Sequence, residues 1–253
     1  MKVRQNLELL YLLVLKDLKI RYKNSALGYL WALANPFAFA FVYWVAFKWI
    51  MRVEMENYSI FLITGLFPWL WLSNGVIQAT RSYQNNATLV KKVKLWRPIL
   101  PLSSVVQEMA HFLCTLPVIV AFLLITVQPM HLSWTWQVPL MILVQLLFTY
   151  SLASLLALAN VFVHDVEYLV GIGFSLLFFA TPMVYPLSMV PENYRIWFQM
   201  SPLHALVNSW REIMLHGRLD FSSAAYVMLS ATLVGLISYR FYRKSSHRIG
   251  ELL

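Results

Sequence analysis

Long apolar segments dominate this 253-residue chain and limit what it can fold into. A helix needs about 20 mostly apolar residues to cross the roughly 30 Å hydrocarbon core of a bilayer. Five segments meet that requirement, and a sixth does so when its outer end, which Pro182 kinks, is included. The predicted transmembrane helices are 29–50, 58–79, 99–127, 138–163, 168–185 and 223–239. The sequence therefore predicts an all-α integral membrane protein with a single transmembrane domain, 1–253.

The composition excludes two other classes of protein. Charged residues make up only 12% of the chain and hydrophobic residues 60%, whereas soluble domains average about 25% charged residues. A soluble enzyme is therefore an unlikely class for this chain. Disordered chains lack the apolar and aromatic residues that are abundant here, so disorder is excluded as well.

The distribution of Lys and Arg predicts the orientation. If the six helices alternate, fifteen cations lie on one side, in 1–28, in the connection after the second helix and in the tail after the sixth. Five cations lie on the other side. Cytoplasmic loops carry an excess of Lys and Arg, so both termini are predicted to be cytoplasmic. This bias also accounts for the net charge of +9 better than a nucleic-acid partner does.

The N-terminal segment 5–23 has a helical pattern but carries too much charge to cross a membrane. Leu7, Leu10, Val14 and Leu18 recur at helical spacing, with Lys16, Lys19 and Lys23 on the other side. Such a helix is predicted to lie in the interface, with its cations toward anionic head groups. It serves either as a membrane anchor or as a cytoplasmic collar for a lipid-linked substrate or a partner subunit.

The outer segment 186–222 is the longest connection, and its second half reads as one amphipathic helix. Ser201 is a good N-cap, Pro202 suits the first turn and Gly217 suits the C-terminal stop. At ~1.5 Å per residue this helix reaches only about 22 Å, too short to cross. We expect a short re-entrant or interfacial helix. Its apolar face consists of Leu203, Leu206, Val207, Trp210 and Met214.

The inner segment 84–98 mixes cations with apolar and aromatic residues before Pro98. A fully solvated loop does not need such apolar residues. A short helix with an apolar and aromatic face docks either on lipid or in a groove on another protein. Both interpretations are compatible with the pattern.

Several kinds of chemistry have no motif in the sequence. None of the eight glycines is followed by Lys, so the chain has no P-loop for ATP. No metal-ligand spacing and no nucleophile elbow occur either, so no metal site and no catalytic residue is predicted. Glu108 and His111 lie three residues apart on one face of a predicted span. Ionisable groups there suggest function by default, but snorkelling or a structural hydrogen bond is the favoured explanation.

Aromatic residues, 15% of the chain, are spread along the predicted spans and not confined to their ends. Lipid contacts and core packing account for most of them. A path lined by aromatic rings would also let sugar rings slide over flat apolar faces.

Five stretches, taken in this order and spacing, carry a family resemblance. They are KDLKIRYKNSALGYLWALANP (16–36), FLITGLFPW (61–69), LVKKVKLWRPILPL (89–102), TPMVYP (181–186) and SPLHALVNSWRE (201–212). Together they resemble the membrane permease subunit of bacterial ABC-2 type polysaccharide exporters, most of all the O-antigen (Wzm-type) permeases, with capsule and teichoic-acid exporters as relatives. One departure is KLWRPILPL, where such permeases more often have an aromatic-Pro-Arg order.

The resemblance implies a transport subunit and not an enzyme. It implies a homodimer in the bacterial inner membrane, bound to a separate cytoplasmic P-loop ATPase that holds ATP and Mg, so this chain needs no cofactor of its own. The implied substrate is an undecaprenyl-pyrophosphate-linked glycan that enters among membrane lipids.

The resemblance also assigns three sets of residues. The ATPase-coupling set is Leu89, Lys91, Lys92, Lys94, Trp96 and Arg97. The lipid-pyrophosphate access set is Lys19, Arg21 and Lys23, because cations offset a concentrated anionic charge. The outer gate set is Tyr194, Trp197, Trp210 and Arg211.

Two rival classes remain open at this point. An ion-coupled secondary transporter would need Glu108 or Asp165 as its coupling group. A membrane enzyme acting on lipid-linked sugars would need clustered acids or histidines, and only His164, Asp165 and Glu167 come near that pattern. The exporter ranks ahead of the secondary transporter, and the enzyme ranks last.

Overall fold

The computed structural model describes residues 2–23, 28–52, 55, 57–93, 95–125 and 131–253. Within these ranges every regular element is a helix. The elements are α1 (Lys2–Tyr22), η1 (Gly28–Leu30), α2 (Trp31–Trp44), η2 (Val45–Ile50), α3 (Tyr58–Thr80), α4 (Ser82–Asn85), α5 (Ala87–Lys92), α6 (Ile99–Ile125), α7 (Trp134–Phe162), α8 (Val166–Ala180), η3 (Leu187–Met189), α9 (Glu192–Gln199), α10 (Pro202–His216), α11 (Phe221–Ser245) and α12 (Ile249–Leu252).

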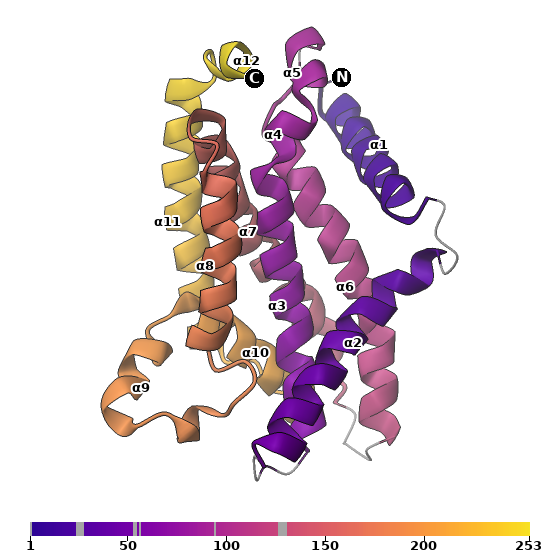
Figure 1. Ribbon diagram of the computed structural model, residues 1–253, viewed down its shortest axis with the longest axis vertical. Coiled ribbons are helices and arrows are strands. Elements are labelled where there is room, and N and C mark those ends of the chain that lie inside the picture. Colours follow the sequence, from indigo (N-terminus) through magenta and orange to yellow (C-terminus); the bar gives the residue numbers. More distant parts are fainter. Residues whose placement is uncertain (1, 24–27, 53–54, 56, 94, 126–130) are drawn as a thin grey trace.

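Helix α3 forms the centre of the bundle. It packs against α6 and α7, and α11 packs on the far side of α7 (Figure 1). Helix α10 fits between α3, α7 and α11, whereas α2 and α8 lie along the flanks of α3. The main hydrophobic cluster of the protein therefore surrounds α3, whose most apolar stretch is 83% buried.

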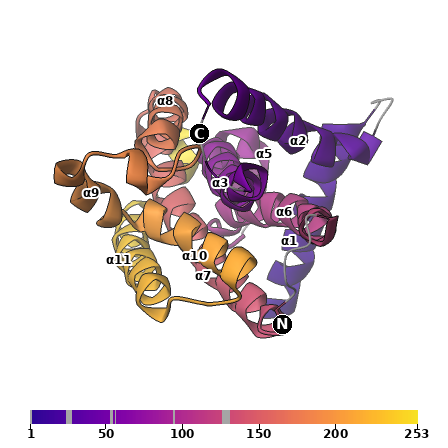
Figure 2. The ribbon, with the colours of Figure 1, turned by 90° about the horizontal axis from the view of Figure 1, so that it is seen from below.

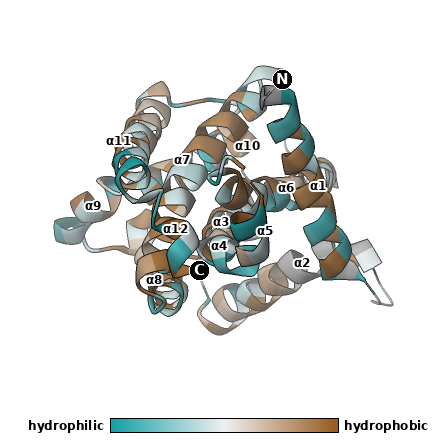
Figure 3. Cartoon of the chain, turned by 90° about the horizontal axis from the view of Figure 1, so that it is seen from above, coloured by the Kyte–Doolittle hydropathy of each residue, from teal (hydrophilic) through white to brown (hydrophobic). Residues whose placement is uncertain are grey.

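Both termini lie at the same end of the bundle, together with α4, α5 and α12 (Figure 1). Viewed onto this end, hydrophilic residues gather along α1, α4 and α5 and at the end of α11 (Figure 3). The link between α7 and α8 also lies here, because Glu167 forms an ion pair with Arg81 at 2.9 Å. Helices α9 and α10 occupy the opposite end (Figure 2). This grouping matches the one that the cation pattern requires.

Each of the six segments expected to span contains a helix. Among the described residues, four helices are long and apolar enough to cross a membrane: α3, α6, α7 and α11. Two further helical segments are apolar but shorter: α8, and the end of α2 together with η2. Helix α7 begins four residues before the expected 138–163, and α11 extends beyond 223–239 to Ser245. Residues 126 and 127 of the expected third span lie outside the described ranges.

The expected fifth span, 168–185, is shorter in the structure. Helix α8 ends at Ala180, and Thr181 has an extended backbone with φ −104° and ψ 138°. The residue before a proline avoids the helical region because its backbone clashes with the proline ring, and Pro182 follows directly. The segment from Thr181 to Pro186 is consequently non-helical, and its carbonyl groups need other donors.

Helix α10 has the capping residues that the sequence predicts. Ser201 precedes it, Pro202 occupies its first turn, and Gly217 ends it in the left-handed conformation at φ 61°. The start of α7 satisfies the exposed carbonyls of this end: Trp134 Nε1 donates to the Ile213 carbonyl at 2.7 Å and Ser133 Oγ to that of Gly217 at 2.8 Å. These contacts fix α10 to the outer end of the bundle.

Candidate functional site

The inner segment 84–98 is an ordered structure tied to the bundle. It contains the end of α4, α5 and a non-helical link before α6. Val90 is buried in a cluster with Leu13 of α1, Tyr83 of α4 and Ile249 of α12. Both ends of the chain therefore pack around this segment.

Two polar contacts add to that packing. The Arg97 guanidinium donates to the carbonyl of Ser246, just after α11. Lys16 of α1 donates from Nζ to Asn86 Oδ1 at 3.0 Å. Because these partners come from both terminal parts of the chain, the inner segment is connected directly to α1 and to the end of α11.

Several side chains of the inner segment are exposed instead. Lys91 and Lys92 are exposed, and Val93 and Trp96 are 48% and 46% exposed. Leu89 is half-buried, and Lys94 lies outside the described residues. The result is a cationic surface with an exposed aromatic ring.

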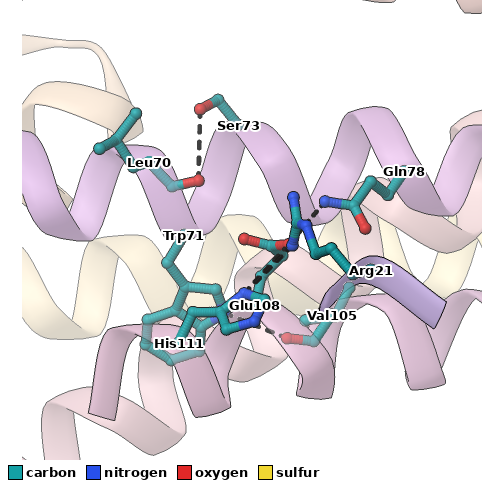
Figure 4. A network of polar contacts seen from close by, with 8 residues as sticks. All are labelled: Arg21, Leu70, Trp71, Ser73, Gln78, Val105, Glu108 and His111. Carbon is teal, nitrogen blue, oxygen red and sulfur yellow. Dashed lines mark hydrogen bonds and ion pairs between the residues drawn. The ribbon is translucent and has the colours of Figure 1, made fainter. Parts of the chain in front are cut away.

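A polar network joins α1, α3 and α6 inside the bundle (Figure 4). Glu108 Oε1 of α6 accepts from Arg21 Nη1 of α1 at 2.5 Å and from Gln78 Nε2 of α3 at 2.5 Å. His111 Nδ1 lies 3.4 Å from the same oxygen. The expected structural role of Glu108 is therefore supported by three direct contacts from three helices.

The network changes how the predicted lipid-access set is interpreted. The Glu108 side chain is 5% exposed and the Arg21 side chain 38% exposed, so Arg21 reaches inward to a buried carboxylate. Lys19 and Lys23 are exposed. The structure thus separates the three cations: Arg21 fastens the end of α1 to α6, and the two lysines are presented at the surface.

The predicted outer gate set is also divided. Tyr194 and Trp197 of α9 are 60% and 71% exposed, but Trp210 and Arg211 of α10 are buried in the core. Trp210 Nε1 donates to Gln145 Oε1 of α7 at 2.5 Å. The four residues consequently do not form one cluster.

Arg211 holds the non-helical segment that follows α8. Its Nη1 donates to the Pro182 carbonyl at 2.8 Å and its Nη2 to the Met183 carbonyl at 2.7 Å. The guanidinium also lies 3.6 Å from the centroid of the Phe61 ring. A Cβ at Gly65 would come within 2.7 Å of Arg211 Nη2, so this position of α3 needs glycine. Arg211 therefore provides donors for carbonyls that have left the helix.

An aromatic groove of about 240 Å³ runs along the flank of α3, between α2 and α8. Trp69 of α3 lies at its base, with ring centroids 5.8 Å from Phe174 and 6.0 Å from Phe178 of α8. Tyr43 of α2 reaches Phe178 at 5.0 Å and links the two walls. Because α2 and α8 pack on α3 more sparsely than α6 and α7 do, this flank is the least covered side of the central helix.

Sequence reasoning did not identify the groove or the partners of Arg21 and Arg211. The aromatic content suggested a path lined by rings but not which rings line it, because the orientation of Tyr43 and Phe37 in α2 depends on contacts with Phe178 of α8 and Phe67 of α3. Gln78 is the one residue that could have indicated the polar network from sequence, because an amide in an apolar span needs a hydrogen-bond partner.

Comparison with known proteins gives one family. The profile of the ABC-2 type transporter family matches residues 8–215. The O-antigen export system permease protein RfbA of Klebsiella pneumoniae is 37% identical over 257 residues, covering 100% of this chain and 99% of that protein. RfbA of Myxococcus xanthus is 32% identical and covers 89% of this chain and 87% of its own length. The polysialic acid transport protein KpsM of Escherichia coli is 24% identical over 91% of each chain.

Proposed function

The chain belongs to the ABC-2 type transporter family, and we propose that it is the permease subunit of an ATP-driven exporter that moves a lipid-linked, O-antigen-like polysaccharide across the bacterial inner membrane. The observation that carries this proposal is its similarity to O-antigen export permeases over its whole length. The more distant similarity to a polysialic acid transport protein favours export of a capsule-type glycan as the second candidate.

The proposed topology has six spans with both termini in the cytoplasm. It uses α3, α6, α7 and α11 as long spans and adds the shorter α2–η2 and α8. Both termini, the inner segment and the end of α11 lie at one end of the bundle, where hydrophilic residues gather (Figure 3), and the positive-inside rule favours the cytoplasmic side for that end. This end then faces the cytoplasm, and α9 and α10 face the periplasm.

A cytoplasmic ATPase subunit is proposed to bind the exposed surface of the inner segment. The chain has no P-loop, so ATP with Mg must be bound by another protein. Lys91, Lys92 and Trp96 offer cations and a ring for a complementary groove, and the packing of Val90 and Arg97 against α12 and the end of α11 passes a displacement into the bundle.

Charge reversal of this surface is expected to separate the two subunits. The Lys91→Glu/Lys92→Glu variant replaces both exposed cations by carboxylates and leaves the buried side of α5 unchanged. We expect the amount of P-loop ATPase that copurifies from native membranes to fall by about tenfold, because like charges facing each other at an interface repel. Protein identification and ATPase assay of the eluate measure this.

Arg218→Glu provides the control, since Arg218 is exposed at the opposite end. It should retain the ATPase at the level of the unmodified chain. An unchanged yield of ATPase with Lys91→Glu/Lys92→Glu would show that the inner segment is not the docking surface. A chain that never copurifies with an ATPase would instead contradict the exporter proposal and favour an ion-coupled transporter.

The aromatic groove is proposed to form one wall of the glycan path, which a second copy of the permease completes. The lipid anchor enters beside α1, where Lys19 and Lys23 meet the pyrophosphate. Flat rings such as Trp69 and Phe178 let sugar rings pass with few fixed hydrogen bonds.

Filling the groove is expected to block transport without loss of the ATPase. Ser175 of α8 lines it and is exposed, so Ser175→Trp adds a large side chain without disturbing the buried core. Export measured as surface glycan should fall by about tenfold or more, because the groove has too little volume for both the glycan chain and the indole ring of the new tryptophan. Leu229→Trp on the exposed face of α11 is the matched control. Equal export by the two variants would place the path elsewhere.

A further inference from the structure

A second cavity, the tyrosine cavity, lies at the end of the bundle that carries both termini. It has a volume of about 280 Å³ and is enclosed by α4, α7, α11 and the link before α6. Ring systems form most of its wall, from Tyr83, Trp96, Tyr150, Tyr239 and Tyr242. The cavity is separate from the aromatic groove, with which it shares no lining residue.

Small residues close the floor of the tyrosine cavity. Ser154 Oγ of α7 lies 2.8 Å from Ser238 Oγ of α11. A Cβ at Gly235 would come within 3.0 Å of Ser151 Oγ, so the two helices are in tight contact there. The larger lining side chains Tyr150, Tyr239 and Tyr242 come from the same two helices, α7 and α11.

The cavity wall offers hydrogen-bond donors without carboxylates. Tyr83 lines the cavity and is only 2% exposed. Burial raises the pKa of the Tyr83 phenol, so the group remains an O–H donor across the physiological range. Tyr150 O–H makes only a long contact, 3.4 Å, with the Pro98 carbonyl.

Two arginines lie next to lining residues of the cavity, although neither lines it itself. The Arg243 guanidinium lies 5.9 Å from the centroid of the Tyr239 ring, and its side chain is otherwise exposed. Arg97 lies within the same link as Trp96 and Pro98 and donates to the Ser246 carbonyl. The site thus combines an aromatic wall, several phenol hydroxyls and two arginines adjacent to its lining residues.

We infer that the tyrosine cavity binds an anionic phospholipid, with the phosphate at Arg243 and the start of an acyl chain against the tyrosine rings. Cationic pockets between helices at the cytoplasmic face bind acidic head groups. Leu233 and Leu236 of α11 are exposed, so the same helix that carries Ser238 and Tyr239 of the cavity offers apolar surface to the remainder of the acyl chain. Trp96 lines the cavity and also belongs to the inner segment, so the bound lipid would touch the proposed ATPase surface.

The test uses the purified full chain in detergent and native mass spectrometry with added lipid. Phosphatidylglycerol should be retained in preference to phosphatidylcholine. Arg243→Gln should reduce that preference about fivefold, the size expected for one cation at an anionic surface. Arg240→Gln is the matched control, because Arg240 is exposed on the same helix three residues earlier but has no contact with a ring of the cavity.

Further variants and a second ligand distinguish a lipid site from general surface charge and from a site for free phosphate. Tyr83→Phe, which removes only the phenol oxygen, should weaken retention while the elution volume and melting temperature stay unchanged. Equal losses with Arg240→Gln and Arg243→Gln would overturn the site in favour of general surface charge. If glycerol phosphate bound as tightly as the lipid, the ligand of the cavity would be a free phosphate and the lipid proposal would be wrong. These readouts need no ATPase and no glycan, so they are independent of the export proposal.

Discussion

Replacing Arg211 with methionine is expected to give the least stable single variant of this protein. Methionine preserves much of the side-chain volume but removes every donor from the carbonyls of Pro182 and Met183. These groups are buried, and each buried acceptor without a partner costs about 1–3 kcal/mol. With the lost contact to the Phe61 ring, the expected destabilisation is about 3 kcal/mol or more.

Thermal unfolding of the purified chain in detergent measures this effect. Arg211→Lys keeps the charge but has no planar fork to serve two carbonyls, so it should recover only part of the loss. Arg195→Met is the matched control, because Arg195 also donates to two backbone carbonyls, at 2.8 and 3.0 Å, but its side chain is 34% exposed. If Arg211→Met melted at the same temperature as Arg195→Met, the structural role of Arg211 would be contradicted.

The helices were predictable because their signals are local. An apolar run of sufficient length identifies α3, α6 and α7, and the capping residues Ser201 and Gly217 mark the limits of α10. Boundaries deviated where tertiary contacts intervene. Helix α7 starts four residues early because Trp134 and its neighbours bind the end of α10.

The sites were less predictable because their contacts are distant in sequence. Arg21 and Glu108 are separated by 87 residues, and Arg211 and the Phe61 carbonyl by 150. A cation in a sequence pattern indicates a preference for an anion or a carbonyl but does not indicate which one. Arg211 was therefore assigned to the outer gate set, and its burial became apparent only from the packing of α10 against α3.

Arg21→Met is expected to destabilise the protein by about 2 kcal/mol, and a second substitution at Glu108 should restore most of the loss. Removing one partner of a buried ion pair leaves the other uncompensated, whereas removing both avoids that cost. Removing Arg21 and removing Glu108 should have different effects on stability, because the Glu108 side chain is 5% exposed and the Arg21 side chain 38%. A stranded Arg21 still reaches water, but a stranded Glu108 does not, so Arg21→Met should be worse than Glu108→Gln.

The cycle of Arg21→Met, Glu108→Gln and the double variant, followed by melting temperature, measures the recovery. Because glutamine still accepts hydrogen bonds and lacks the charge, the double variant should melt close to Glu108→Gln alone. A double variant no more stable than Arg21→Met would show that the two residues act independently.

The same carboxylate separates the exporter from the ion-coupled transporter. If Glu108 holds α1, α3 and α6 together, neutral variants retain ATP-driven export, because the role requires hydrogen-bond acceptors and not titration. Export by Glu108→Gln/Asp165→Asn should therefore persist and stay insensitive to collapse of the proton gradient while ATP is maintained. A secondary transporter that uses either carboxylate would lose its coupling ion in that variant. Abolished export with a normal melting temperature and normal ATPase copurification would assign Glu108 or Asp165 a coupling role, because those two readouts exclude misfolding and loss of the partner.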